Sequence, residues 1–146
     1  MQVDLSGLRA LVTGSTKGIG RAIARELAAN GAEVVINGRK PADVEQAIAG
    51  LRAALPNGRF APAPGDVATA AGVADIIAAA GEVDILVNNV GVFEIKDAFA
   101  IPDEDWERLF AINVLSGVHY APRMRANGFG RSSSSHRNPA RRCRPR

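Results

Sequence analysis

The hydrophobic positions of the chain form short continuous runs that alternate with apolar stripes at helical spacing. Residues 8–13, 32–37 and 83–87 are runs rich in Val, Leu and Ile, which predicts strands buried on both faces. Between 19 and 28, and again between 44 and 55, apolar residues recur three and four positions apart, which predicts amphipathic helices. This alternation indicates a mostly parallel sheet with helical crossovers, an α/β fold.

Three weaker segments extend the pattern. Residues 59–64 (RFAPAP) contain two prolines, which donate no hydrogen bond to a ladder, so this strand is expected at an edge of the sheet. Val73, Ile76 and Ile77 indicate a short helix. The acid-rich segment Pro102-Asp103-Glu104-Asp105 is typical of the start of a helix that would continue through Trp106 toward Val118.

Length and charge divide the chain into two parts. The 146 residues are 47% hydrophobic, enough for one domain with a buried core. Residues 1–107 hold nine basic and all fifteen acidic residues, whereas residues 108–146 hold nine arginines and no acid. Since residues 132–146 (SSSSHRNPARRCRPR) contain no aliphatic residue larger than alanine, we predict a domain over 1–131 and a disordered basic tail over 132–146.

Several classes of protein are disfavoured by the composition. The single cysteine, Cys143, permits no internal disulfide, and no Cys/His cluster suggests a metal site. The first residues lack the pattern of an export signal, and no apolar run reaches membrane-spanning length. We therefore expect a soluble cytoplasmic protein without a membrane partner.

The turn between the first strand and the first helix carries the strongest functional signal. Its sequence is TGSTKGIG, over residues 13–20. Backbone N–H groups and the positive end of the helix favour an anion there, and glycines let a pyrophosphate approach the backbone. The hydroxyl groups can tie the turn or reach a phosphate, and a plain structural turn is the alternative. The residues expected to bind a cofactor here are Thr13, Gly14, Ser15, Thr16, Lys17, Gly18, Ile19 and Gly20.

The end of the second strand indicates which dinucleotide would bind. An acidic residue commonly holds the adenosine ribose hydroxyls at this point, but the sequence here is Asn37-Gly38-Arg39-Lys40. Arg39 suits a 2′-phosphate, and Lys17 could reach the same group. NADP(H) is thus favoured over NAD(H), with Asn37 and Arg39 as binding residues. The alternative is a solvated basic turn before a helix.

Polar residues also follow the third and fourth strands. Asp66 and Val67 follow residues 59–64, and Asn88, Asn89 and Gly91 follow residues 83–87. The carboxyl ends of parallel strands share one edge of the sheet, where ligands bind in open α/β folds. We expect Asp66 to accept from the adenine amino group and the turn at 88–91 to lie beside a ribose, although Asn88 and Asn89 could simply turn the chain.

Together these motifs resemble the short-chain dehydrogenase/reductase family. The residues that carry the resemblance are TGSTKGIG at 13–20, DV at 66–67, NNVG at 88–91 and Asn113, and it covers residues 1 to about 131. The resemblance implies a Rossmann-type doubly wound parallel sheet, here incomplete, with strand order 3-2-1-4. It also implies hydride transfer between a nicotinamide dinucleotide and a small carbonyl or alcohol substrate, and a homo-oligomer with the helix around Asn113 in its interface.

The family's catalytic group is only partly matched. Its chemistry uses a Ser and a Tyr-x-x-x-Lys pair, supported by an Asn that Asn113 matches. The only tyrosine is Tyr120, with Met124 four positions later, and the lysines all lie upstream. The resemblance therefore implies an oxidoreductase lineage in a chain without its acid–base residues.

The arginine-rich end of the chain has more than one interpretation. In place of the family's fifth strand, the sequence after Arg131 has arginine, serine and proline, which favours a truncated or frameshifted end. With that strand missing, the outer edge of residues 83–87 would be unpaired. A non-catalytic nucleotide-binding or regulatory protein is the second hypothesis. Nucleic-acid binding through the tail is a third, disfavoured because no aromatic residue follows Phe129.

Overall fold

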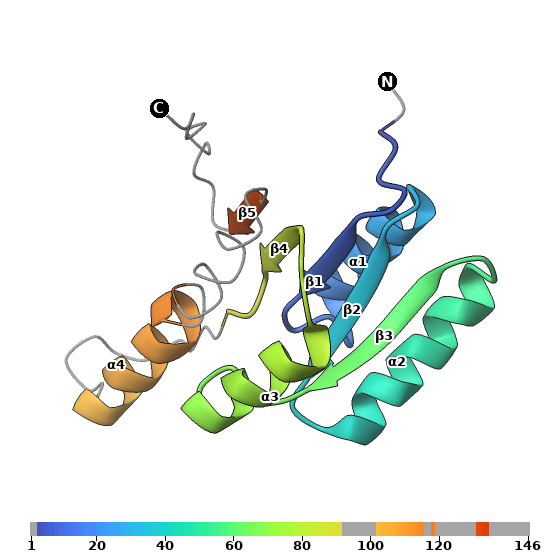
Figure 1. Ribbon diagram of the computed structural model, residues 1–146. Helices are drawn as coiled ribbons and strands as arrows, with labels where there is room; N and C mark the ends of the chain where they lie inside the picture. The colour runs from blue at the N-terminus through green and yellow to red at the C-terminus, as the bar shows by residue number, and fades with distance from the viewer. Residues whose placement is uncertain (1–2, 92–101, 116–117, 119–130, 135–146) are drawn as a thin grey trace, which may run out of the picture.

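The computed structural model describes residues 3–91, 102–115, 118 and 131–134. The elements alternate between strand and helix along the chain (Figure 1). They are β1 (Arg9–Val12), α1 (Gly18–Ala29), β2 (Glu33–Gly38), α2 (Pro41–Ala54), β3 (Arg59–Pro64), α3 (Ala70–Ala80), β4 (Ile85–Asn88), α4 (Asp103–Phe110), the π-helical turn η2 (Ala111–Leu115) and β5 (Arg131–Ser134).

The strands form one parallel sheet in the order β3-β2-β1-β4-β5. The predicted order 3-2-1-4 is confirmed, and β3, with its two prolines, lies at an edge as expected. β2 and β3 are added on one side of β1, and after β3 the chain crosses back to add β4 on the other side. The carboxyl ends of β1 and β4 therefore lie beside each other at the centre of the sheet. This is the switch point at which doubly wound sheets bind ligands.

Helices cover both faces of the sheet, so successive residues of a strand are buried on opposite sides. On one face, Val34 and Ile36 pack with residues of α1 and α2. On the other face, Val35 packs with α3 and with Ile112 of η2. This two-sided burial explains why the strands appear in the sequence as continuous apolar runs.

The fifth strand was not predicted. Residues 131–134 pair in parallel with β4, in the register Ile85 to Arg131 through Asn88 to Ser134. The expectation that the outer edge of β4 is unpaired is therefore wrong, and residues 132–134 of the predicted tail belong to the sheet. Strand pairing is made by backbone N–H and C=O groups, so a serine run can extend a ladder without an apolar pattern. Residues 135–146 of the tail lie outside the described part of the chain.

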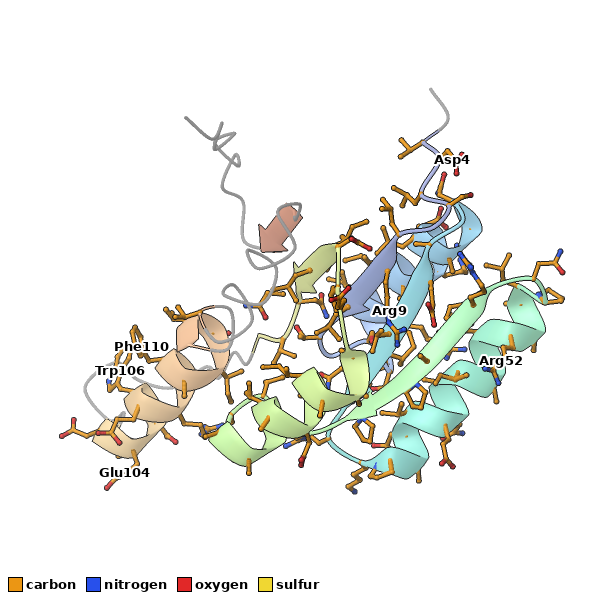
Figure 2. The ribbon with its side chains drawn as sticks, in the orientation of Figure 1. Asp4, Arg9, Arg52, Glu104, Trp106 and Phe110 are labelled. Carbon is orange, nitrogen blue, oxygen red and sulfur yellow. The ribbon has the colours of Figure 1, made fainter. Side chains whose placement is uncertain are left out.

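The helix predicted to run from 102 toward Val118 changes type after Phe110. The α-helical part ends there and η2 continues it with wider π-helical turns. Trp106, Phe110, Val114 and Val118, which recur every four residues, are 55%, 55%, 45% and 58% exposed. Figure 2 shows Trp106 and Phe110 on the side of α4 that points away from the sheet. We call these four residues the α4 stripe.

Among the described residues, no helix is both long and apolar enough to cross a membrane.

Candidate functional site

The predicted cofactor-binding residues lie at the carboxyl edge of the sheet. The turn at 13–20 follows β1, and the polar residues after β2, β3 and β4 lie at the same edge because the four strands are parallel. Gly14 and Asn37 are far apart in the sequence, as are Thr13 and Asn89, yet the two residues of each pair are hydrogen bonded. The expectation that these turns come together is confirmed.

Thr13 joins the end of β1 to the end of β4. Its hydroxyl oxygen accepts hydrogen bonds from the backbone N–H groups of Asn89, at 3.0 Å, and Val90, at 3.2 Å. The same hydroxyl donates to Asn88 Oδ1 at 3.1 Å. One donor and two acceptor positions complete the capacity of a hydroxyl group. Since Thr13 is fully buried, its side chain ties the turn, which was one of the two roles that the sequence left open.

Ser15 joins the same turn to β2 and is also fully buried. Its hydroxyl donates to the carbonyl of Val12 at 2.7 Å and accepts from the N–H of Asn37 at 2.9 Å. Its backbone N–H donates to the carbonyl of Asn37 at 2.9 Å. The turn is thus fixed to β4 through Thr13 and to β2 through Ser15.

The absence of side chains at two glycines allows this packing. Gly14 has a φ of 61°, in the left-handed region, and a Cβ there would approach Val90 Cγ2. A Cβ on Gly20 would collide with the carbonyl oxygen of Gly14 and with Asn89 Nδ2. That Asn89 amide donates to the carbonyls of Thr13 and Gly14, at 3.2 and 3.3 Å. Glycine is therefore required where α1 begins against the end of β4.

Other predicted residues remain accessible. Lys17, Gly18 and Ile19 are exposed at the start of α1, and Ile19 is 72% exposed although it is apolar. Arg39 and Lys40 are exposed between β2 and α2, and Gly91 is exposed after β4. Thr16 is half-buried, with its methyl group over Gly38, where a Cβ would clash.

The N-terminus of α1 is suited to an anion. Its N-cap residue, Lys17, makes no side-chain capping hydrogen bond, and the first turn has no acidic residue. The first N–H groups of a helix have no partner within the helix, and the helix dipole adds partial positive charge. Together with the exposed cations Lys17 and Arg39, this end of the site attracts negative charge.

Asp66 and Val67 follow β3 with different exposures. Asp66 is half-buried, and its Oδ1 accepts from the N–H of Ala68 at 2.9 Å while its carbonyl accepts from the N–H of Thr69 at 3.2 Å. Val67 is buried among the residues of the α3 face. The carboxylate is therefore held in a fixed direction at the carboxyl edge of the sheet.

Asn113 lies on η2 and is half-buried. The preceding residue, Ile112, is buried with Leu11 and Leu86 of the central strands, which anchors η2 to the α3 face of the sheet. η2 therefore includes the residue that the sequence resemblance matches to the supporting Asn of the family.

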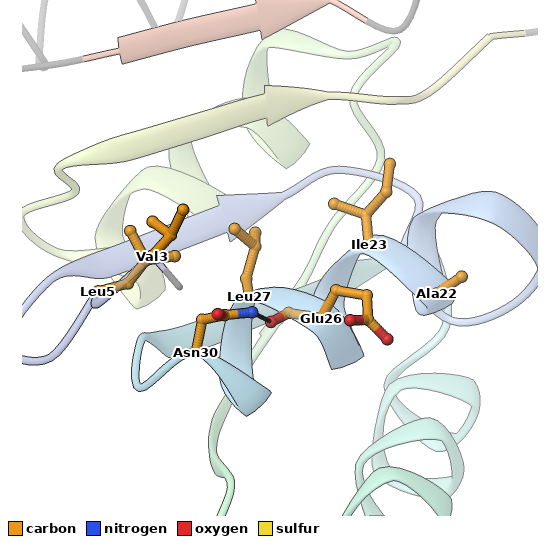
Figure 3. Close-up of a pocket in the computed structure, with 7 residues that line it drawn as sticks. All are labelled: Val3, Leu5, Ala22, Ile23, Glu26, Leu27 and Asn30. Carbon is orange, nitrogen blue, oxygen red and sulfur yellow. Dashed lines mark hydrogen bonds between the residues drawn. The ribbon is translucent and has the colours of Figure 1, made fainter. Parts of the chain in front are cut away.

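A groove elsewhere on the molecule has a different character (Figure 3). It lies between residues 3–5 and α1 and measures about 600 Å³. Its lining is mostly apolar, with the residues Val3, Leu5, Ala22, Ile23, Glu26, Leu27 and Asn30. None of the predicted site residues lines it. In the described ranges, no group of three or more His, Cys, Asp or Glu side chains could hold a metal ion.

Sequence reasoning missed the division between buried and exposed site residues. It placed Thr13, Ser15 and Asn37 among the expected cofactor-binding residues, with tying of the turn as the alternative role of the two hydroxyls, and the side chains of all three are buried. A signal was present for Asn37, because it directly follows three apolar residues of a strand predicted to be buried on both faces.

Comparison with known proteins places the chain in a family. The short chain dehydrogenase model matches residues 9–130. The oxidoreductase YvaG of Bacillus subtilis, itself uncharacterized, is 47% identical over 123 residues, which cover 84% of this chain and 47% of that protein. The D-beta-hydroxybutyrate dehydrogenase of Rhizobium meliloti is 38% identical over 130 residues, covering 84% of this chain and 50% of that protein.

Solved structures agree with the sequence matches. The L-sorbose reductase of Gluconobacter frateurii, solved with NADPH and L-sorbose, aligns with a TM-score of 0.83 and 33% identity, over 92% of this chain and 54% of that one. The 3-oxoacyl (acyl-carrier-protein) reductase of Agrobacterium tumefaciens, solved with NADP, aligns with a TM-score of 0.79 and 35% identity, over 90% of this chain and 53% of that one. The chain spans about half the length of these relatives. It belongs to the short-chain dehydrogenase family.

Proposed function

We propose that this chain binds NADP(H) at the carboxyl edge of its sheet and that, by itself, it does not catalyse hydride transfer. One observation carries the binding proposal. The glycine turn is fixed to β2 and β4 by buried hydrogen bonds, while the N-terminus of α1 and the cations beside it remain exposed. A rigid turn of this kind presents its backbone without a further ordering cost, which favours binding of a pyrophosphate.

Each group at this edge of the sheet has a proposed role. The start of α1, over Gly18–Gly20, would receive the pyrophosphate, and Lys17 and Arg39 would hold the 2′-phosphate that distinguishes NADP(H) from NAD(H). Asp66 would accept from the adenine amino group, and the turn at 88–91 would lie beside a ribose. The bound nicotinamide would supply or accept hydride. The solved relatives with NADPH and NADP support this assignment.

The proposed lack of catalysis follows from the residues present. The sequence contains no Tyr-x-x-x-Lys, and its lysines are at positions 17, 40 and 96. General acid–base assistance is typically worth ~10²–10⁴-fold in rate. Asn113 matches the family's supporting Asn, which cannot replace the proton-transferring Tyr. The relatives named as oxidoreductases support the lineage, and the missing residues support the loss of activity in this chain.

We further propose that copies of the chain associate through the α4 stripe. Its four large side chains are about half exposed and recur every four residues through α4, η2 and position 118, and exposed apolar side chains that gather in this way mark an interaction site. A cytoplasmic location remains our proposal, supported by the single cysteine of the sequence.

The proposal of binding without turnover is tested on the purified 146-residue chain. Fluorescence of the reduced nicotinamide reports binding, and its absorbance with a panel of small ketones and sugars reports turnover. We expect a saturable change in fluorescence with NADPH and no oxidation above the rate without protein. Steady NADPH oxidation dependent on a carbonyl substrate would contradict the proposed loss of catalysis.

A further inference from the structure

Asn37 is a buried polar residue whose position needs an explanation. It is only 1% exposed, although it directly follows the apolar residues Val34, Val35 and Ile36 on β2. A primary amide that loses water without gaining partners destabilises a fold. The contacts of its side chain therefore decide what the residue does.

The oxygen and the nitrogen of the Asn37 side-chain amide form hydrogen bonds at the ends of two different strands. Oδ1 accepts from the backbone N–H of Gly14, at 3.1 Å, in the turn after β1. Nδ2 donates to the carbonyls of Ala63, at 2.9 Å, and Gly65, at 3.2 Å, at the end of β3. These partners fix the orientation of the amide, because an N–H requires the oxygen and two carbonyls require the nitrogen. One side chain thus links the ends of β1 and β3 across β2.

The backbone of Asn37 strengthens the same link. Its N–H donates to Ser15 Oγ at 2.9 Å, and its carbonyl accepts from the N–H of Ser15 at 2.9 Å. Two consecutive N–H groups of the glycine turn, those of Gly14 and Ser15, therefore donate to Asn37. These two N–H groups are directed into the protein, and the N–H groups that remain for an anion are those that follow Ser15.

We propose that Asn37 is a positioning residue for the glycine turn and makes no contact with the dinucleotide. It holds the Gly14 N–H inward and so sets the direction in which the later N–H groups and the start of α1 face. This inference rests on the proposed function for its ligand. It replaces our sequence-based hypothesis that Asn37 itself binds the cofactor.

The first test compares Asn37→Ala with Val35→Ala. Val35 is a matched control, because it lies on the same strand two positions away and is fully buried. Both variants should be less stable than the wild type. At a temperature where both are folded, Asn37→Ala should bind NADPH at least about tenfold more weakly, whereas Val35→Ala should bind within about twofold of wild type. Equal affinities of the two variants would overturn the positioning role.

The second test needs no variant and separates the inference from the proposed function. In NMR spectra of the wild-type chain, the Gly14 amide should exchange slowly with solvent, and its chemical shift should move less on addition of NADPH than those of Gly18 and Gly20. A Gly14 amide that exchanges rapidly, or that shows the largest shift, would overturn the inference. Absence of any NADPH binding by the wild type would contradict the proposed function, and the exchange rate of Gly14 would still test its bond to Asn37.

Discussion

The segments that follow β1 and β4 begin at neighbouring points of the sheet but differ in how they are held. After β1, the turn at 13–20 is hydrogen bonded to two other strands, and α1 buries Gly20, Ala24 and Ala28. After β4, α4 buries none of its own residues and exposes Trp106 and Phe110. The turn at 13–20, the proposed cofactor site, is thus completed by contacts within the chain. The α4 side exposes large apolar side chains, which we propose are covered by another copy of the chain.

The largest effect is expected from Gly20→Ala, which would disrupt the packing of α1 against the turn at 13–20 and the end of β4. The added Cβ meets backbone and side-chain atoms of Gly14 and Asn89, so α1 must shift away from β4. We expect the free energy of unfolding to fall by about 3 kcal/mol and NADPH affinity to fall at least about 100-fold. Urea unfolding and fluorescence titration measure the two effects.

Gly81→Ala is the control for this variant. Unlike Gly20, Gly81 has a positive φ, of 64°, and a Cβ there meets open space at the end of α3. It should cost about 1 kcal/mol through backbone strain and leave NADPH affinity unchanged. Equal NADPH affinities of the two variants would contradict the role assigned to Gly20.

Thr13→Val tests the link between β1 and β4. Valine keeps the shape of threonine but leaves the N–H groups of Asn89 and Val90 without their acceptor. Because an unsatisfied buried donor costs about 1–3 kcal/mol, we expect a loss of about 2 kcal/mol in the free energy of unfolding. Thr13→Ser retains the hydroxyl and should lose less. A valine variant more stable than the serine variant would refute the link.

Arg39→Ala sharpens the assignment of the cofactor. Its side chain is exposed, so we expect stability to change little. NADPH affinity should fall about tenfold, or about 1.4 kcal/mol, whereas NADH affinity should not change. Arg25→Ala removes an exposed cation in the middle of α1 and should alter neither affinity. An equal loss of affinity for both dinucleotides on Arg39→Ala would argue against a contact with the 2′-phosphate.

The smallest effect on stability is expected on the α4 side. In the double variant Trp106→Ser, Phe110→Ser, the free energy of unfolding of the isolated chain should change by about 0.5 kcal/mol or less, because both side chains are more than half exposed. Self-association should weaken, and sedimentation velocity over a range of concentrations measures it. The same sedimentation profile for the variant and the wild type would contradict the proposal that copies of the chain associate through the α4 stripe.

Those features that depend on local patterns were predictable from the sequence. Continuous apolar runs gave the strands, prolines placed β3 at an edge, and glycines marked the turn after β1. The apolar run before Asn37 indicated its burial, but the contacts of Thr13 and Asn37 were not predictable, because a hydroxyl or amide at a strand end can face a ligand or a neighbouring strand, and only tertiary contacts decide between them. β5 was missed because its pairing is made by the backbone and leaves no apolar pattern. The preference for NADP(H) and the disorder of residues 135–146 stay predictions.

Isothermal titration calorimetry of the 146-residue chain with NADPH and with NADH tests the central claim most directly. We predict saturable binding of one NADPH per chain, with a dissociation constant at least about tenfold below that for NADH. Absence of binding heat with either dinucleotide across several temperatures, in a sample whose circular dichroism shows a folded α/β protein, would contradict the account.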